Sequence, residues 1–472
     1  MVMMDVAADS PSVADSLREL TGADPMLCYQ CRKCTAGCPV ADQSDLGPHQ
    51  VMRAVQLGWA DQALRSRMVW LCVSCQICSS RCPQSIEVAD VMDGLKILGL
   101  QRGLKPSVPE VDVFNRAGLI SLRYLGRMYE LGVMAGFNLG TRRPFKDLGL
   151  GLKLIRNGNM RLLPSVTRRR SYQPPAAART PEANAVAFFP GCSLHSTASD
   201  FGTSIHAVAG RLGLKLEEPE GWLCCGSKPA AWHSPEMGAE YPLRNLAAVG
   251  EMGHRTVTTP CAACFSRFKH AVHQVEASSE MADRMADVTG YRYDGIAVEH
   301  LVETVDRLVG PKKLASLVQK PLRGLKIACY YGCLMTRPAT LTGADDQENP
   351  MQMDRLMRAL GAEVVDWSYK TECCGGSHSV TRSDLVVGLS RKILDAAAAA
   401  GADLVATSCP LCHLNLDGRQ MQYLQKDGGT PLPVLYFTQL IGLALGLDAR
   451  ATAIDKLLVD ARPVLSAKGA LN

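Results

Sequence analysis

The cysteines carry the clearest chemistry in this sequence, because their spacing matches that of metal-cluster ligands. The chain has 472 residues, of which 19 are cysteines. The motif C-x2-C-x2-C-x3-C-P occurs at residues 28–39 and again at 72–83. In such motifs three thiolates of one tight loop bind a [4Fe–4S] cube, while the fourth cysteine binds the cube of the other loop. The spacing therefore predicts two neighbouring cubane clusters and electron transfer through them.

This crossing rule assigns eight ligands. The first cluster is expected to bind Cys28, Cys31, Cys34 and Cys82, and the second to bind Cys72, Cys75, Cys78 and Cys38. Structural zinc is the alternative, but zinc sites usually combine paired C-x2-C motifs with four ligands per ion. The run of three cysteines plus one, followed by proline, favours the clusters.

A second cysteine pattern occurs twice in the rest of the chain. Each copy has a single cysteine after an apolar run, then Cys-Cys-Gly, then C-x2-C. The first copy comprises Cys192, Cys224, Cys225, Cys261 and Cys264, and the second comprises Cys333, Cys373, Cys374, Cys409 and Cys412. Because three separate motifs recur at similar intervals, the pattern predicts a duplicated domain.

Five thiolates exceed the needs of one zinc ion or of one cube. A four-iron centre held by five thiolates would be bridged or opened, and an opened cluster can present iron to a substrate sulfur. Soft thiolate and disulfide sulfur suit such iron, so the pattern indicates disulfide chemistry.

These cysteines require strands and helices to position them. Short apolar runs precede Cys192 and Cys333, helical patterns follow both, and further strands are expected at 256–259, 363–367 and 404–408. Strand, cysteine turn and helix in this order are typical of an α/β domain with a parallel sheet. Ligands of such sheets bind at the carboxyl ends of the strands, where these cysteines fall. The remaining cysteine, Cys329, is expected to be a buried, inert thiol within a strand.

Residues 101–180 are strongly basic, with 15 Lys and Arg against 4 Asp and Glu in a chain of net charge +5. We expect an amphipathic helix over 117–140 and an extended Pro-, Ala- and Arg-rich linker over 164–185. A solvated surface, an acidic partner and anionic lipid are all compatible with this charge. No basic block is long enough to indicate nucleic-acid binding.

Neither a secretory signal nor a membrane span is apparent in the sequence. We therefore expect a cytoplasmic protein, with peripheral membrane association through a partner.

The segments CYQCRKCTAGCP and WLCVSCQICSSRCPQSIEVADVM, with both Cys-Cys-Gly repeats, resemble the C and B subunits of heterodisulfide reductase fused in one chain, as in the D subunit of its membrane-linked form. The resemblance covers residues 26–98 and 186–446. It implies an α-helical ferredoxin-like N-terminal domain with two [4Fe–4S] clusters, followed by a duplicated α/β CCG domain pair. The expected boundaries are 1–100 for the ferredoxin-type domain, 101–185 for the connector and linker, 186–320 for the first CCG domain and 321–472 for the second.

The resemblance also implies cofactors, partners and a reaction. Two cubane clusters would pass electrons to two non-cubane [4Fe–4S] clusters, one on each five-cysteine set, where a disulfide is reduced or thiols are oxidised. Because no nucleotide or flavin motif is present, the electron donor is expected to be a flavoprotein like the A subunit, or a membrane cytochrome, in a hetero-oligomeric complex. His378 and His413, next to cysteines of the second set, are candidate proton donors, and His195 and His233 are further candidates.

Two other functions are alternatives to disulfide reduction: an electron relay and a zinc-stabilised scaffold. Iron–sulfur subunits of flavin-dependent 2-hydroxy-acid or glycerol-3-phosphate dehydrogenases share this layout and relay electrons toward quinone. The complete five-cysteine sets favour disulfide chemistry over this relay. A zinc-stabilised scaffold without redox activity conflicts with the cubane spacing.

Overall fold

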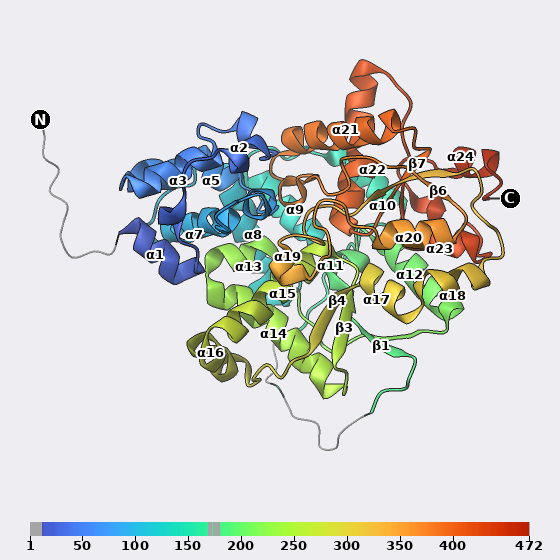
Figure 1. Cartoon of the computed structure of the whole chain (residues 1–472), viewed down its shortest axis with the longest axis horizontal. Coiled ribbons are helices and arrows are strands. Elements are labelled where there is room, and N and C mark those ends of the chain that lie inside the picture. The colour runs from blue at the N-terminus through green and yellow to red at the C-terminus, as the bar shows by residue number, and fades with distance from the viewer. Residues whose placement is uncertain (1–11, 169–171, 173–179, 472) are drawn as a thin grey trace, which may run out of the picture. The chain divides into compact units, whose positions relative to one another are not determined.

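The chain divides into two compact units, Met1–Pro109 and Glu110–Asn472. The structure is a computed structural model and describes residues 12–168, 172 and 180–471 (Figure 1). The predicted domain boundaries near 100, 185 and 320 stay predictions.

The described part of the first unit is helical and contains no strand. Its helices are α1 (Val13–Thr21), α2 (Lys33–Ala36), α3 (Pro48–Gln56), α4 (Ala60–Arg65), α5 (Arg67–Leu71), α6 (Ile77–Ser80) and α7 (Val88–Gln101), with 3-10 turns at Pro25–Leu27 and Ala41–Gln43. The longest helix, α7, buries residues on nearly every side, as expected of a helix at the centre of a small domain. The short α2 and α6 each begin inside a cysteine motif.

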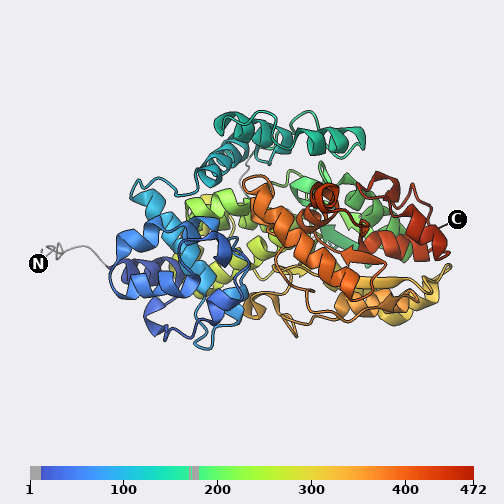
Figure 2. The ribbon, with the colours of Figure 1, turned by 90° about the horizontal axis from the view of Figure 1, so that it is seen from above.

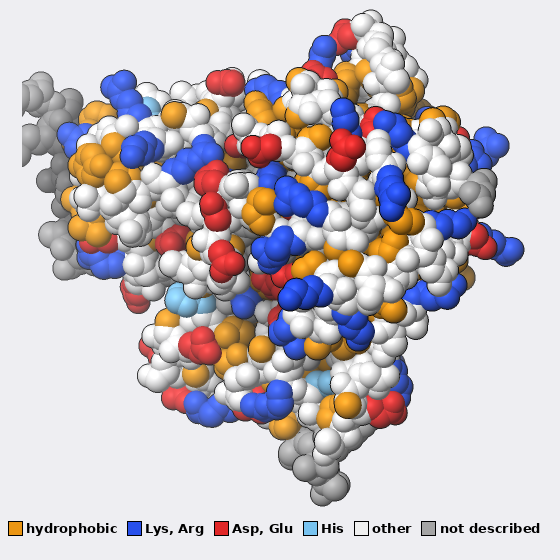
Figure 3. All heavy atoms as spheres, turned by 45° about the vertical axis from the view of Figure 1, so that its right-hand side comes forward, with side chains coloured by type: hydrophobic (Ala, Val, Ile, Leu, Met, Phe, Trp, Pro, Cys, Tyr) orange, Lys and Arg blue, Asp and Glu red, His pale blue; other side chains and the backbone are white. Residues whose placement is uncertain are grey.

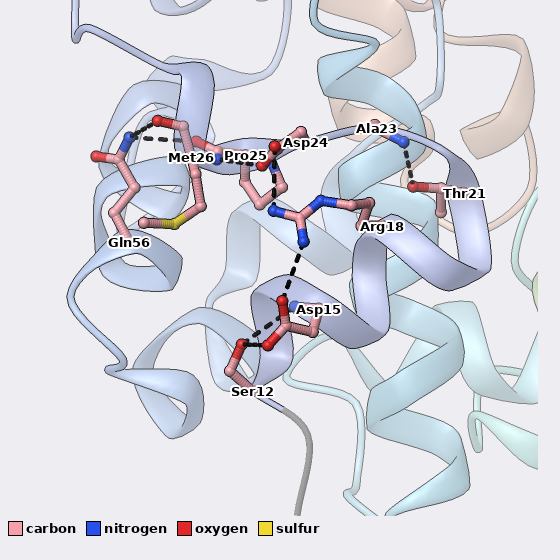
Figure 4. Close-up of polar contacts among 9 residues, drawn as sticks. All are labelled: Ser12, Asp15, Arg18, Thr21, Ala23, Asp24, Pro25, Met26 and Gln56. Carbon is pink, nitrogen blue, oxygen red and sulfur yellow. Dashed lines mark hydrogen bonds and ion pairs between the residues drawn. The ribbon is translucent and has the colours of Figure 1, made fainter.

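Side chains of α1 and α3 fix the segment that leads into Cys28. Arg18 of α1 bridges Asp15 and Asp24 at 3.1 Å each (Figure 4). Gln56 at the end of α3 donates its amide to the carbonyl of Pro25 at 3.1 Å and to that of Cys28 at 2.7 Å. The backbone before the first motif is therefore tied to two helices.

The second unit contains two four-stranded parallel sheets with the same topology. The first has the order β2-β1-β3-β4 and the second the order β6-β5-β7-β8. Their strands are β1 (Ala185–Phe188), β2 (Lys215–Glu217), β3 (Thr256–Thr259), β4 (Ala297–His300), β5 (Lys326–Tyr330), β6 (Glu363–Val364), β7 (Leu404–Thr407) and β8 (Val434–Tyr436). The identical order confirms the predicted duplication and parallel α/β architecture.

The strands predicted at 256–259 and 404–408 appear as β3 and β7, whereas the strand predicted over 363–367 covers only Glu363–Val364. The chain leaves the sheet there, and the indole of Trp367 donates to the carbonyl of Cys329 at 3.2 Å. Cys329 is fully buried on β5, as predicted.

Helices flank both sheets. Those of the first CCG domain and the segment after it are α11 (Gly191–Leu194), α12 (Ser199–Leu212), α13 (Ser227–His233), α14 (Pro235–Glu251), α15 (Ala262–Ala277), α16 (Ser279–Thr289), α17 (Leu301–Leu308) and α18 (Gly310–Leu317). Those of the second are α19 (Ala339–Thr342), α20 (Gln352–Ala359), α21 (Ser383–Ala399), α22 (Pro410–Asp427), α23 (Phe437–Ala444) and α24 (Arg462–Ala467), with 3-10 turns at Gly376–His378 and Ile454–Lys456. The two domains pack together through α12 and α23, where Ser204 and Thr438 share a hydrogen bond of 2.7 Å.

The connector forms three helices, α8 (Pro109–Leu125), α9 (Glu130–Gly140) and α10 (Leu148–Arg156). The prediction of one continuous helix over 117–140 was therefore wrong. The break lies at Gly126, whose φ of +71° ends α8 and whose carbonyl accepts a hydrogen bond from the backbone of Cys224 at 3.0 Å. Most of the predicted linker, at 169–171 and 173–179, lies outside the described residues.

In Figure 2, α9 and α10 lie in teal along the upper edge, outside both sheets. None of the described helices is long and apolar enough to cross a bilayer. On the face drawn in Figure 3, basic and acidic side chains are interspersed.

Candidate metal centres

The two cysteine loops of the first unit share an unusual backbone geometry. Gln30 and Arg32 have φ values of 65° and 67°, and the corresponding Ser74 and Gln76 have values of 50° and 62°. Left-handed residues that alternate with other conformations turn backbone N–H groups toward one concave side, which suits anions and iron–sulfur clusters. The N–H of Ser74 already donates to the sulfur of Cys72 at 3.4 Å.

A pocket with about 360 Å³ of empty space lies beside the second loop. The thiols in its wall belong to Cys38, Cys72, Cys75 and Cys78, the set that the crossing rule assigns to one cluster, and its other lining residues are apolar. Burial raises the pKa of Cys38 and Cys78, and the neighbouring thiols raise it further. Ionising four thiols in this pocket requires a compensating cation, so the donor set fits an iron cluster.

Lys96 stabilises the same loop, although its role could not be read from the sequence. Its side chain is fully buried, and its ammonium donates to the carbonyl of Cys72 at 2.9 Å and to Asp93 at 3.0 Å. Asp93 in turn accepts a hydrogen bond from Ser74 at 2.8 Å. This buried cation lies beneath one predicted ligand.

The first loop is more exposed. Cys31 is exposed, while burial raises the pKa of Cys34 to about 11. Tyr29 lies near the thiols of Cys28, Cys31 and Cys82, so the fourth cysteine of the other motif approaches this loop.

In each CCG domain, the cysteines follow the carboxyl ends of three adjacent strands. Cys192 comes after β1, the Cys224-Cys225 pair after β2, and Cys261 directly after β3, where it is the N-cap of α15. The second domain repeats this order after β5, β6 and β7 with Cys333, Cys373, Cys374, Cys409 and Cys412. Since all these strands are parallel, the cysteines of each domain lie at one edge of its sheet, as predicted.

A glycine before the first cysteine of each set makes room for the last one. Gly191 and Gly332 have φ values of +72° and +70°. A Cβ on Gly191 would lie 3.2 Å from the sulfur of Cys264, and a Cβ on Gly332 would lie 3.0 Å from that of Cys412. Both the left-handed backbone and the close sulfur favour glycine at these positions.

Eight of the ten thiols in the two sets form one continuous row across the domain boundary. In the first domain, Cys224 contacts Cys192 and Cys225, and Cys264 links Cys225 to Cys261. Cys261 contacts Cys409 of the second domain, which contacts Cys412. The sulfurs of Cys412 and Cys374 are 3.5 Å apart. The two candidate centres are therefore direct neighbours.

The protonation of these thiols is strongly perturbed. Hydrogen bonding with Cys192, together with burial, raises the pKa of Cys224 well above its usual range. Hydrogen bonding with Cys412 lowers the pKa of Cys374 in spite of its burial.

Within the described residues, no three His, Cys, Asp or Glu side chains form a group that could hold a single metal ion. The soft, buried, multi-thiol donor set fits iron–sulfur chemistry.

The connector completes the first of these sites. The N–H of Met128 donates to the sulfur of Cys192 at 3.4 Å. Arg127 donates from Nε to the carbonyl of Trp222 at 3.0 Å, and its guanidinium carbon lies 3.6 Å from the centre of the indole ring. These contacts come from a segment that the sequence placed outside the CCG domains.

A pocket with about 350 Å³ of empty space opens beside Cys192. Arg127, Arg161, His195 and Trp222 line it together with this cysteine. Glu130 also lines it, but its carboxylate already accepts hydrogen bonds from Ser193 at 2.8 Å and from the backbone of Thr197 at 3.1 Å. The two guanidinium groups make the pocket suitable for an anion.

The candidate proton donors have different surroundings. His378 is fully buried, with Nδ1 2.8 Å from the hydroxyl of Thr381. His413 is held by the carbonyl of Val434 at 2.9 Å from Nε2, and burial lowers its pKa to about 4. The ring of His413 is therefore neutral near pH 7.

At the first CCG domain, His195 lines the pocket, stacks on Trp222 and lies 3.5 Å from Glu218. His233 is exposed at the end of α13.

His300 was not among the predicted site residues, because β4, which it ends, was not predicted. Nδ1 of His300 accepts the backbone N–H of Val302 at 3.3 Å, which leaves the proton on Nε2. Nε2 is buried and has no well-formed hydrogen bond in the described structure, although the Pro260 carbonyl is near. Burial lowers the pKa of His300 to about 4, while the nearby Cys409 raises it. A neutral N–H donor therefore lies near the thiol row.

Comparison with known proteins defines the class of protein to which this chain belongs. Residues 27–87 match the 4Fe-4S dicluster domain, and residues 186–269 and 327–417 match the cysteine-rich domain called CCG. The chain is 34% identical over 279 residues to the 8-methylmenaquinol:fumarate reductase membrane anchor subunit of Wolinella succinogenes, covering 58% of this chain and 97% of that protein.

Two further relatives match different parts of the layout. The B subunit of the ferredoxin:CoB-CoM heterodisulfide reductase of Methanosarcina mazei is 29% identical over 282 residues, covering 58% of this chain and 93% of the relative. The iron–sulfur C subunit of the CoB–CoM heterodisulfide reductase of Methanopyrus kandleri is 33% identical over 76 residues, covering 16% of this chain and 40% of the relative. The chain belongs to the CCG iron–sulfur protein family and combines parts like the C and B subunits of heterodisulfide reductase in one polypeptide. It is an iron–sulfur oxidoreductase with a role in electron transfer.

Proposed function

We propose that this chain is the disulfide-handling iron–sulfur subunit of a heterodisulfide reductase-like complex. The eight N-terminal cysteines would hold two cubane clusters that take up electrons, and the five-cysteine sets would hold two non-cubane [4Fe–4S] clusters that supply electrons for the reduction of a disulfide. In the opposite direction the same centres would take up electrons from two thiols.

The observation that carries this proposal is the pocket beside Cys192. A simple electron relay needs no space next to a cluster thiol, whereas a substrate does. The pocket has about 350 Å³ of empty space and is lined by Cys192. Cys192 is one end of the thiol row, and Cys374 is the other.

The protein residues around the pocket have separable roles in this mechanism. Arg127 and Arg161 bind anionic groups of the substrate, and the indole of Trp222 holds the Arg127 guanidinium in place. The clusters supply single electrons and iron that accepts sulfur. Overall, one disulfide, two electrons and two protons give two thiols, so a proton donor is required at each departing sulfur.

Histidines supply those protons in our proposal. His378 is the candidate at the second centre, and His195 is the candidate in the pocket of the first. His413, the other predicted donor, is neutral near pH 7 and donates its Nε2–H to the carbonyl of Val434. His195 is partly exposed and paired with Glu218, so it can exchange protons with solvent.

An electron-donating partner, either a flavoprotein or a membrane cytochrome, would dock at the exposed edge of the first cubane. In the segment that leads into the first loop and the exposed Cys31, the large apolar side chains of Met26, Leu27 and Tyr29 are each at least half exposed. Such a patch next to a cluster suits transient docking of an electron-transfer protein.

A second candidate function is electron transfer between quinol and a partner enzyme. It is favoured by the similarity to the 8-methylmenaquinol:fumarate reductase membrane anchor, which this chain covers almost completely. In that case the CCG centres would exchange electrons with a quinone and not with a disulfide.

The two functions are separated by EPR on anaerobically purified protein, with thiols, disulfides or a menaquinol analogue added. Four clusters predict about sixteen Fe per chain. The disulfide proposal predicts a signal that changes when a thiol is added to the oxidised protein. Signals that respond to the menaquinol analogue alone would support the second function.

A variant tests the proton donor. His378→Gln should slow disulfide reduction and leave the iron content unchanged, whereas His233→Gln, at an exposed position, should change neither. Unchanged turnover in His378→Gln would exclude this histidine.

A further inference from the structure

Exposed apolar side chains are concentrated on the connector. In the described part of the chain, ten of the seventeen large apolar side chains that are exposed lie within 120–166, but only two lie within 180–471. Three of the ten, Leu148, Leu152 and Ile155, are spaced i, i+4 and i+7 along α10 and are 50%, 57% and 40% exposed. The opposite side of α10 buries Leu154. This helix therefore presents an apolar stripe outward.

The stripe extends into the turn before α10 and into the end of α9. Phe145 is 78% exposed and Leu139 is 71% exposed. We call the exposed side chains of residues 139–156 the connector face. Figure 2 shows that α9 and α10, which carry this face, lie outside the sheets.

The connector face is also cationic. Arg142, Arg143, Lys153 and Arg156 are exposed on it. The only acidic residue within 131–168 is Asp147, and it pairs with Arg419 of the second CCG domain. The face thus combines exposed leucine and phenylalanine side chains with net positive charge, unlike the mixed surface in Figure 3.

The inner side of the connector is firmly attached to the second CCG domain. Lys146 donates to the carbonyls of Val380 and Thr381, and Asn157 donates to the carbonyl of Lys456 at 3.1 Å. Phe137 is fully buried. Because these contacts fix the orientation of α9 and α10, the apolar stripe is held outward and does not result from loose packing.

From these observations, we propose that the connector face docks this protein on a lipid surface that carries anionic headgroups. Helices that lie in the membrane interface combine outward Leu and Phe side chains with flanking Lys and Arg, as this face does. An anionic bilayer matches both features of the face at once, because its acyl region takes up the Leu and Phe side chains and its headgroups pair with the Arg and Lys side chains. Since no described helix can span a bilayer, docking is peripheral. This inference goes beyond the proposed function and does not depend on the identity of the substrate.

Vesicle flotation of the full chain, purified anaerobically with its clusters, tests the proposal. The protein should float with vesicles of phosphatidylcholine mixed with phosphatidylglycerol, and less with phosphatidylcholine alone. Added salt should weaken the binding. Absence of flotation with the anionic vesicles, or equal flotation with both kinds, would overturn the proposal.

Two variants and their matched controls locate the surface. Arg142→Glu with Arg143→Glu should weaken binding by more than about 25-fold, since each basic residue near an anionic surface contributes about fivefold. Lys312→Glu with Lys313→Glu, an exposed basic pair on α18, should have little effect. Leu148→Ser with Leu152→Ser should weaken binding at every salt concentration, whereas Val288→Ser with Leu308→Ser should not.

Iron content and melting temperature check that each variant is folded. If the controls lose binding as much as the connector variants, docking through this face is wrong. If the protein does not float but the Arg142→Glu, Arg143→Glu variant loses an acidic partner protein, the face is a protein interface and the lipid proposal is rejected.

Discussion

The backbone N–H of Met128 donates a hydrogen bond to the sulfur of Cys192 across 3.4 Å, although 64 residues separate them. The neighbouring Gly126 accepts a hydrogen bond from the backbone of Cys224 at 3.0 Å. The connector thus contacts two of the five cysteines in the first CCG set. It contributes to this centre as well as joining two parts of the chain.

Removing the cation next to this centre should lower its reduction potential. Arg127 lies near Cys192 and Cys224, so its positive charge stabilises the more negative, reduced state of a cluster held there. Arg127→Gln should shift the midpoint of the first CCG centre by tens of millivolts, because about 1 kcal/mol corresponds to about 40 mV for one electron. An EPR-monitored redox titration measures the shift. Arg123→Gln, at an exposed position on α8, is the control and should leave the midpoint unchanged.

Substituting the fourth cysteine of each N-terminal motif should remove the cluster of the other motif. Cys38 lies in the same pocket as Cys72, Cys75 and Cys78, so Cys38→Ser should affect that cluster. Cys82→Ser should instead affect the cluster of the first motif. Each variant should lose up to about four Fe of about sixteen, and EPR at graded potentials distinguishes the cluster that is lost. Loss of the cluster of its own motif in either variant would contradict the crossing rule.

Local patterns predicted much of this architecture. The spacing of the cysteines and the apolar runs of β1, β3, β5 and β7 depend on short stretches of sequence. Both the duplication and the parallel sheets could therefore be predicted. The strands β2, β4 and β8 were not predicted. They have three or four residues each, and their sequences lack a distinct period.

Contacts between distant residues could not be predicted in the same way. Arg127, Met128 and His300 approach the cysteines only because the chain folds back over the sheet edge. The helix break at Gly126 shows the same limit. Gly126 lies within the amphipathic pattern of residues 117–140. Nothing in that pattern indicated that its carbonyl would accept a hydrogen bond from the N–H of Cys224.

A buried carboxyl group at the interface of the CCG domains should make stability depend on pH. Burial raises the pKa of Asp200 to about 7, and its Oδ1 has no hydrogen-bond partner in the described structure. The unfolded chain releases this proton near pH 4, whereas the folded chain keeps it to about pH 7. The folded state therefore binds more protons between these values, and stability falls as the pH rises through them.

Asp200→Asn should remove this penalty. We expect the variant to be more stable than the wild type by about 1–3 kcal/mol at pH 8, with a smaller difference at pH 5. Thermal unfolding at the two pH values measures the effect. Asp417 is the matched control, because burial also raises its pKa to about 7, but its carboxyl accepts the backbone N–H groups of Leu458 and Val459. Asp417→Asn loses one acceptor oxygen and should destabilise the protein at both pH values; equal behaviour of the two variants would refute the assignment.

The glycine before each set of five cysteines provides a test of whether a centre forms on that set. At Gly191 a methyl group would meet the sulfur of Cys264 at 3.2 Å on a backbone with φ of +72°, so Gly191→Ala both strains the backbone and displaces a thiol. Gly213 has the same φ, but a methyl group there meets nothing within 4 Å. Gly213→Ala therefore reports the backbone strain alone, about 1–2 kcal/mol of stability.

We expect Gly191→Ala to lose the EPR signal and iron of the first CCG centre, while Gly213→Ala keeps about sixteen Fe and melts at a lower temperature. Gly332→Ala should remove the second centre in the same way, because its methyl group would lie 3.0 Å from the sulfur of Cys412. Since Cys261 and Cys409 are in contact, loss of one centre should also shift the midpoint potential of the other. Full iron content in Gly191→Ala would contradict the prediction that a methyl group there displaces a ligand thiol, and an unshifted potential would show that the two centres are electrostatically independent.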